Sequence, residues 1–303
     1  MLKKELDYVS SAPKIKDSTS YKVFKVCNAV LMAVIAMLTL YPFLYLVAQS
    51  FSSEAAIYKG LVTIIPVGFN VDTYKSVLSK GEFLQFYGNT IYYAVLGTVC
   101  SVLTTAMLAY PLSKPSLRLN KFFSPFVIFT MYFGGGMIPN YVLMNSLGLR
   151  NTTAAFILPG LIGTYYVLLM RSFFMGLPHE LEEAAEIDGL SKIGVFFRIA
   201  LPLSKPIMAT MTLFYMSGYW SNWFNAFLYL DNRAKWPVAY YLRQIILGAT
   251  TTSEVGATDA VSNQIASNIR STSMVLMVLP IICVYPFVQK YFVQGMMLGG
   301  VKE

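Results

Sequence analysis

The sequence predicts an all-α membrane protein with six transmembrane helices. Hydrophobic residues make up 56% of the 303 residues and charged residues only 13%, whereas soluble proteins carry about 25% charged residues. Six runs of 19 to 31 residues contain no Asp, Glu, Lys or Arg, and each is long enough to cross a hydrocarbon core of about 30 Å as a helix. This pattern excludes a soluble enzyme. The runs are residues 26–53, 83–113, 122–149, 151–170, 206–230 and 271–289.

The first run follows a basic, hydrophilic segment, residues 1–25, which we predict to be a cytoplasmic tail. The run is longer than the apolar core of a signal peptide and has no convincing small-residue cleavage site. Residues 26–50 are therefore predicted to form the first transmembrane helix. The basic residues of the tail are Lys3, Lys4, Lys14, Lys16, Lys22 and Lys25.

The distribution of Lys and Arg predicts that both termini are cytoplasmic. With the N-terminus inside and six alternating spans, 15 Lys and Arg lie on the cytoplasmic side and 8 on the other, as the positive-inside rule requires. The bias is clearest in the short loop 112–121, where Lys114, Arg118 and Lys121 have no acidic neighbour in the sequence. The net charge of +8 is thus a sign of topology and of contact with membrane lipid, and we expect no nucleic-acid partner.

This topology places residues 51–86, 146–152 and 231–270 outside and residues 295–303 in a cytoplasmic C-terminal tail. Within the first external segment, Pro, Gly and Asn residues at 66–70 predict a turn that leads into a short helix.

The third run contains Gly134, Gly135 and Gly136 shortly before Pro139, which disfavours a continuous helix. Two interpretations remain open. The helix is interrupted where protein or a watery cavity covers the backbone, or the glycines allow close packing of helices.

Residues 177–206, between the fourth and fifth runs, must lie outside the hydrocarbon. Each acidic side chain at the bilayer centre costs about 2.5–3.5 kcal/mol, and this segment carries five of them close together. Pro178 is expected to start a helix that Gly189 ends, because Pro tolerates the first turn and glycine favours the position after a helix. Ser191 can cap a second short helix that ends before Pro202. The acids are Glu180, Glu182, Glu183, Glu186 and Asp188.

Residues that could hold a cofactor or metal are sparse. Cys27, Cys100 and Cys283 lie in or beside apolar runs, so we expect them to act as packing residues, and their odd number disfavours a disulfide framework. His179 is the only histidine and has no second ligand at a suitable spacing. No segment matches the phosphate-binding loop G-x-x-x-x-G-K-[ST]. We therefore expect this chain to bind no metal or cofactor and not to be an ATPase.

The fifth run carries polar and aromatic residues that suit a sugar. Gly218, Asn222, Asn225 and Tyr229 recur at helical spacing, and neutral amides beside aromatic rings match the hydroxyls and apolar faces of sugars. The alternative is that Trp220 and Trp223 form an interfacial aromatic belt and that the asparagines bond to neighbouring helices. Arg171 is interpreted as an anchor at the inner end of the fourth span. The translocation-path candidates are Tyr215, Tyr219, Trp220, Asn222, Trp223 and Asn225, with Asn140 and Tyr141 as weaker additions.

The acidic segment resembles the EAA motif of ATP-binding-cassette (ABC) importer permeases, the loop by which such subunits dock on their ATPase. The match comprises a Glu-Ala-Ala, an Asp-Gly three residues on and a later Leu-Pro, and Leu190 stands where the family usually has Ala. The resemblance implies that Glu183 and Gly189 shape the coupling element. The residues assigned to coupling are Glu183, Ala184, Ala185, Ile187, Asp188, Gly189, Leu190 and Phe196, and the motif continues through Ile199, Leu201 and Pro202.

Residues 133–152, 219–230 and 285–303 narrow the resemblance to carbohydrate-importer permeases of the maltose-permease type, in the branch related to LplC and YtcP. The resemblance implies a type I ABC importer permease fold, with residues 87–294 as a core permease domain of five transmembrane helices. It implies a bacterial plasma-membrane assembly with a sister permease as heterodimer, a cytoplasmic ATPase dimer that uses ATP and Mg, and an external lipoprotein that captures an oligosaccharide.

Two other functions compete with this interpretation. A permease for a peptide or for a fragment of an anionic polysaccharide fits the same motif, although few intramembrane charges disfavour a small, strongly charged solute. A membrane-embedded enzyme would need clustered acids, histidines or an activated serine at membrane depth, and the six runs lack acids altogether. The chain is therefore predicted to be a non-catalytic transport subunit.

Overall fold

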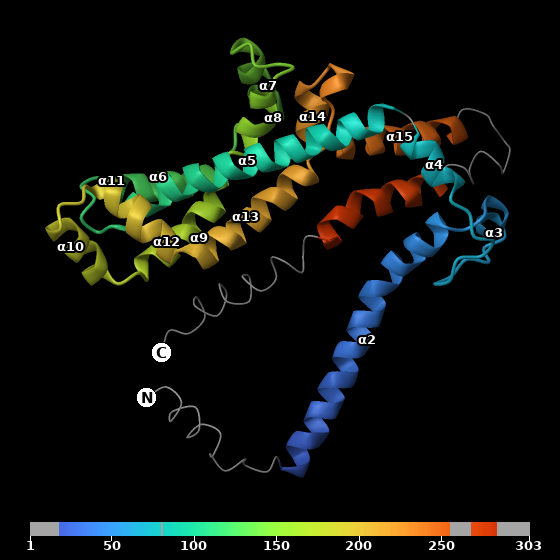
Figure 1. Ribbon diagram of the computed structural model, residues 1–303, viewed down its shortest axis with the longest axis horizontal. Helices are drawn as coiled ribbons and strands as arrows, with labels where there is room; N and C mark the ends of the chain where they lie inside the picture. The colour runs from blue at the N-terminus through green and yellow to red at the C-terminus, as the bar shows by residue number, and fades with distance from the viewer. Residues whose placement is uncertain (1–17, 80, 255–267, 284–303) are drawn as a thin grey trace.

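The computed structural model describes residues 18–79, 81–254 and 268–283, and every regular element in these ranges is helical, which confirms that the fold is all-α as predicted (Figure 1). The helices are α2 (Thr19–Ser50), α3 (Glu54–Tyr58), α4 (Asp72–Leu78), α5 (Glu82–Ser113), α6 (Asn120–Tyr132), α7 (Met137–Ser146), α8 (Thr153–Ile157), α9 (Thr164–Met175), α10 (His179–Ile187), α11 (Lys192–Val195), α12 (Leu201–Leu203), α13 (Lys205–Trp220), α14 (Phe224–Tyr229) and α15 (Val238–Glu254), followed by a helix over Asn268–Cys283.

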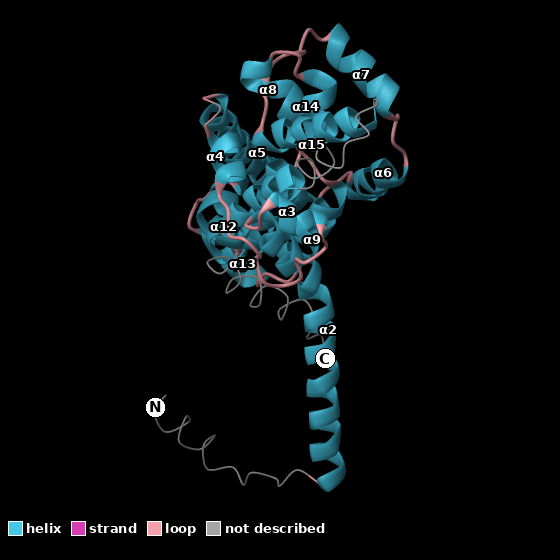
Figure 2. Cartoon of the chain, turned by 90° about the vertical axis from the view of Figure 1, so that its right-hand side faces the viewer, coloured by secondary structure: helices cyan, strands magenta, loops and turns pink. Residues whose placement is uncertain are grey.

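Helix α2 projects away from the other helices (Figures 1 and 2). It begins at Thr19 rather than at residue 26, because the Ser18 side chain accepts a hydrogen bond from the Tyr21 amide at 3.2 Å and so caps the first turn. Only Ala48, Gln49 and Ser50, at its C-terminal end, are buried. A helix that is apolar on all sides is suited to lipid or to another apolar surface.

Helix α5 is the centre of the fold and packs along α13 and α9. On α5, Gly97, Ser101, Thr105 and Ala109 recur every four residues, and those with side chains are buried. Residues at this spacing lie on one helix face, and small side chains allow the backbones of neighbouring helices to approach closely.

The helix of the third run is interrupted, which was one of the two interpretations that the sequence left open. Helices α6 and α7 meet at an angle of 111°, and Gly136 has a φ of +88°, a conformation that favours glycine. A Cβ atom on Gly134 would have no heavy atom within 4 Å, and one on Gly135 would meet only Pro139. Close helix packing within this chain therefore does not explain these glycines.

The fourth run is also bent, and the chain bends again just before the fifth run begins. Residues Thr153–Gly160 meet α9 at 57°, and residues Lys192–Leu203 meet α13 at 82°. By length and composition, α2 and α5 can each cross a membrane, and the count rises to five if each bent pair is one span. The sixth run is described only as far as Cys283, so the count of six spans stays a prediction.

The predicted external segments contain more helix than expected. The turn at Gly68, with a φ of +66°, leads into α4 as predicted. Helix α15 was not predicted, although Val238, Leu242 and Ile245 lie close to helical spacing. Val238 and Leu242 are buried in a cluster with Phe86 of α5. The segment 231–270 is rich in polar residues, and for this reason the helical spacing of its apolar residues was not recognised in the sequence.

Tyr219 of α13 links α5 to the bend between α8 and α9. Its hydroxyl hydrogen-bonds the Ser101 hydroxyl at 2.8 Å and donates to the Ile157 carbonyl at 3.2 Å. A Cβ atom added to Gly97 would lie 2.7 Å from the Tyr219 ring, closer than real contacts allow. Because both hydrogen bonds hold this buried ring, it cannot move aside without losing them.

We therefore expect Gly97→Ala to destabilise the protein by about 1–3 kcal/mol, the usual cost of overpacking a core. Gly88→Ala, in the same helix but with open space around the added Cβ, should instead stabilise it by roughly 0.5–1 kcal/mol, because alanine is the better helix former. Thermal unfolding of the detergent-solubilised variants measures both effects. Equal effects of the two substitutions would contradict the described packing of Tyr219.

Candidate functional site

The segment 177–206 forms two short helices at one end of α5 (Figure 1). Helix α10 begins directly after Pro178, with Glu180 and Glu182 in its first turn, where carboxylates are favoured by the helix dipole. Gly189 follows with a φ of +87°. The Ser191 hydroxyl then accepts a hydrogen bond from the Gly194 amide at 3.2 Å and caps α11. The helix start after Pro178, the bend at Gly189 and the cap at Ser191 are as predicted.

The second helix does not end before Pro202, as the sequence had predicted. Residues Phe196–Ala200 form a π turn, in which the Leu201 amide donates to the Phe196 carbonyl. The wider turn accommodates Pro202, which has no amide hydrogen to donate. The chain therefore continues as α12 through Leu203 and on into α13.

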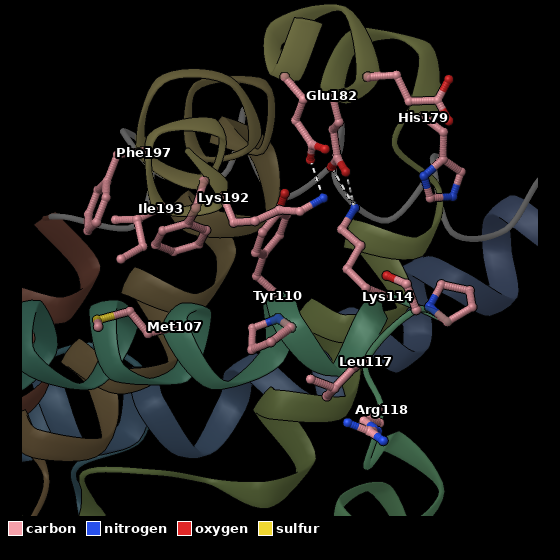
Figure 3. Close-up of a pocket in the computed structure, with 16 residues that line it drawn as sticks. Met107, Tyr110, Lys114, Leu117, Arg118, His179, Glu182, Lys192, Ile193 and Phe197 are labelled. Atoms are coloured by element: carbon pink, nitrogen blue, oxygen red, sulfur yellow. Dashed lines mark hydrogen bonds and ion pairs between the residues drawn. The ribbon is translucent and has the colours of Figure 1, made fainter. Parts of the chain in front are cut away.

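An ion pair joins α10 to the end of α5 (Figure 3). The Lys114 ammonium donates to the two carboxylate oxygens of Glu182 at 2.6 and 2.5 Å. The side chains are only 16% and 10% exposed, so the pair is largely withdrawn from water. Removing one partner of a buried pair costs about 3–5 kcal/mol, because the other charge is left uncompensated.

Aromatic contacts reinforce this ion pair. The Lys114 ammonium lies 4.7 Å from the centre of the Tyr110 ring. The Tyr110 ring contacts Phe196 of the π turn at 5.1 Å and Phe174 of α9 at 5.5 Å between ring centres. The two short helices are therefore packed firmly onto the last turns of α5.

A cavity of about 790 Å³ lies between these helices and α5. It combines apolar side chains with charged ones, and the ion-paired Lys114 and Glu182 are among the residues that line it (Figure 3). The residues that line it are Met107, Tyr110, Pro111, Lys114, Pro115, Ser116, Leu117, Arg118, His179, Glu182, Glu183, Glu186, Lys192, Ile193, Phe196 and Phe197.

The predicted coupling residues fall into two groups. Ile187 is 86% exposed at the outer end of α10, and Ile193 of α11, which was not among the candidates, is 71% exposed. Ala185 and Phe196, predicted as contacts for a partner, instead lie buried within the chain. Glu183, Ala184, Asp188 and Gly189 are exposed and Leu190 is half-buried.

The C-terminal end of α5 is bonded to two further helices. The Leu112 carbonyl accepts a hydrogen bond from the Arg171 side chain of α9 at 2.8 Å and one from the side-chain amide of Asn120 of α6 at 3.2 Å. Arg171 thus anchors α9 to α5. Lys114 was predicted only as a topology signal, and its role as an ion-pair partner could not be seen because Glu182 is distant in the sequence.

The substrate-path candidates of the fifth run do not form one helical stripe, because α13 ends at Trp220 and α14 begins at Phe224. The Tyr215 hydroxyl accepts from the Gly163 amide at 3.0 Å, and the Asn225 side chain donates to the Phe156 carbonyl at 2.9 Å. Tyr215, like Tyr219, therefore bonds the backbone around the α8–α9 bend.

The remaining candidates also make contacts within the chain. The Trp220 indole donates to the Met277 carbonyl at 3.0 Å. The Trp223 ring lies 3.5 Å from the guanidinium of Arg243, a residue of α15 that the sequence did not single out. The Asn222 side chain accepts from the Asn225 amide. Tyr141 stacks on Tyr229 at 6.3 Å, and Asn140 lies exposed on α7.

The described residues contain no group of three or more His, Cys, Asp or Glu that could hold a metal ion. The helix pair α10 and α11 is thus an acidic, partly apolar unit at the C-terminal end of α5.

Comparison with known proteins agrees with this arrangement. Residues 97–298 match the family described as binding-protein-dependent transport system inner membrane component. The chain is 43% identical to protein LplC of Bacillus subtilis (strain 168), over 93% of this chain and 95% of LplC. It is 36% identical to the polygalacturonan/rhamnogalacturonan transport system permease protein YtcP of the same strain, over 88% of this chain and 94% of YtcP.

A solved structure has the same fold. It is described as a bacterial ABC transporter involved in the import of the acidic polysaccharide alginate, and it matches with a TM-score of 0.80 and 33% identity, over 93% of this chain and 100% of that chain. The chain therefore has an ABC transporter permease fold and belongs to the family of inner membrane components of binding-protein-dependent transport systems.

Proposed function

We propose that this chain is a permease subunit of an ATP-driven importer and that it forms, with a sister permease, the translocation path for an oligosaccharide. The observation that carries the proposal is the exposed surface of α10 and α11, which we call the docking element. Helices α10 and α11 present exposed apolar residues, Ile187 and Ile193, beyond the end of α5, and exposed apolar groups beside charged ones are typical of a protein-binding surface.

In this proposal the energy for transport is supplied by a partner ATPase dimer, which binds ATP and Mg. Closure of the ATPases moves the docking element, and the permease pair alternates between inward-facing and outward-facing states. An external lipoprotein delivers the solute. Both termini of this chain lie in the cytoplasm of the bacterial cell, on the same side as the docking element.

A second candidate solute is an acidic oligosaccharide. YtcP carries polygalacturonan and rhamnogalacturonan in its name, and the solved relative concerns alginate. Within this chain, Arg243 lies over the Trp223 ring, and none of the ion pairs among the described residues involves it. An arginine beside an aromatic ring suits a sugar that carries a carboxylate.

Replacing Ile187 by Asp should weaken the docking of the ATPase. A buried apolar anchor contributes about 2 kcal/mol or more to an interface, so the affinity should fall about 30-fold. Retention of ATPase subunits on the affinity-tagged permease assembly measures the effect. Ile65→Asp, at another highly exposed isoleucine, between α3 and α4, should leave retention unchanged. Retention of the ATPase by both variants would contradict the docking role.

Replacing Gly189 by Val should disturb the bend between α10 and α11. A side chain at a positive φ costs about 1–2 kcal/mol. Gly60→Val provides a matched control, because Gly60 also has a positive φ and open space around it. Both variants should lose similar thermal stability, but only Gly189→Val should reduce ATP-dependent uptake into proteoliposomes. Normal uptake by Gly189→Val would count against the coupling role of the bend.

The choice between neutral and acidic solutes can be tested with the reconstituted assembly. Uptake of maltotetraose and tetragalacturonate is compared for the wild type and for Arg243→Gln. If the solute is acidic, loss of a charge-assisted hydrogen bond of about 1.5 kcal/mol should reduce tetragalacturonate uptake about tenfold. Arg233→Gln, whose arginine is already paired with Glu82, should have little effect. Uptake of maltotetraose alone would exclude the acidic candidate.

A further inference from the structure

The docking element is tied to α5 by one ion pair that is unlike the others in the described residues. The pairs of Lys75 with Asp72, Arg150 with Asp231, Lys192 with Glu186 and Arg233 with Glu82 each include side chains that are a third or more exposed, whereas both Lys114 and Glu182 are largely buried. A well-solvated pair holds its helices weakly. A buried pair with two short hydrogen bonds has a defined geometry.

The position of Lys114 makes this geometry mechanically important. Lys114 is the residue directly after α5, and its backbone carbonyl accepts a hydrogen bond from the Asn120 side chain at 3.0 Å. Its ammonium also lies over the Tyr110 ring, which in turn contacts Phe196. The pair therefore joins the first turn of α10 to the last turn of the central helix, and the ring contact joins α5 to the π turn after α11.

Helix α5 extends from this pair into the core, where Ser101 and Thr105 hydrogen-bond Tyr219 and Tyr215. Those tyrosines bond the backbone at the α8–α9 bend. A displacement of α10 would thus pass through α5 to the membrane core by a continuous series of contacts. Such a series couples two sites only if its members move together.

We infer that Lys114 and Glu182 are positioning residues that make α5 move as one body with the docking element when the ATPases close. This inference rests on the proposed function. Without the pair, α10 could still bind the ATPase, but α5 would no longer follow the movement of α10. ATP hydrolysis would then continue without an equal movement of solute.

The first test measures the distance between α5 and α10 in the complete assembly. Spin labels are placed at Val99→Cys on α5 and Glu180→Cys on α10, two exposed positions, after Cys27, Cys100 and Cys283 are replaced by serine. In the wild type, the label-to-label distance should be the same without nucleotide and with ATP trapped by vanadate. In Lys114→Met, the distance should shift or broaden on trapping. A distance that changes in the wild type, or stays fixed in Lys114→Met, would overturn the inference.

The second test measures the number of solute molecules taken up per ATP hydrolysed, with whichever of maltotetraose and tetragalacturonate the wild type transports. Lys114→Met should lower this ratio about fivefold or more, the range of typical coupling between sites. Lys114→Arg keeps the cation and should retain the wild-type ratio. Lys192→Met, which breaks the exposed pair with Glu186 on the same element, should also retain it.

A folding defect is distinguished by the double variant Lys114→Met/Glu182→Met, which leaves no unpaired buried charge and should assemble normally. It should still show the low uptake ratio and the changed distance, and a wild-type ratio in this variant would refute the positioning role. The proposed function is judged separately, since it fails if the wild-type assembly shows no ATP-dependent uptake at all. In that event the distance measurement still decides whether α5 and α10 move together.

Discussion

The hydrocarbon core of a membrane offers no water to backbone amides and carbonyls, so a span can be interrupted only where other protein groups bond the freed backbone. The bend between α8 and α9 meets this requirement through Tyr215, Tyr219 and Asn225, which bond the backbone at residues 156, 157 and 163. The small residues on α5 follow from the same constraint, because the tyrosine rings must fit between two backbones. The α6–α7 break lies on an exposed surface of the single chain, as expected of a subunit whose family works in assemblies.

The end of the molecule formed by α10 and α11 follows a different physical rule. Segment 177–206 is too acidic to enter the hydrocarbon, so it must be held by contacts outside it, and the C-terminal end of α5 supplies them. Lys114 neutralises Glu182, and Tyr110 covers Phe196. This explains how one segment can be both acidic and apolar. Its inner face is bonded to α5, whereas Ile187 and Ile193 remain exposed on its outer face.

Local features were predictable from the sequence, whereas contacts between distant residues were not. The start of α10 at Pro178, the bend at Gly189 and the cap at Ser191 depend on neighbouring residues, and all three were predicted. The continuation of the helix past Pro202 was not, because proline usually ends a helix and here the π turn over Phe196–Ala200 accommodates it. The pairing of Lys114 with Glu182 was also missed, since charge counting along the chain cannot show which opposite charges meet in space.

The substrate-path candidates show why polar residues within a span are ambiguous. Amides and phenols at membrane depth are needed wherever a backbone is interrupted, and they are equally suited to a sugar in a watery cavity. Tyr215, Tyr219 and Asn225 bond an interrupted backbone, so their presence in the sequence does not by itself indicate a solute. Arg243 is different, because its guanidinium lies on the Trp223 ring rather than on a backbone carbonyl. This pair is therefore the more informative place to test for solute specificity.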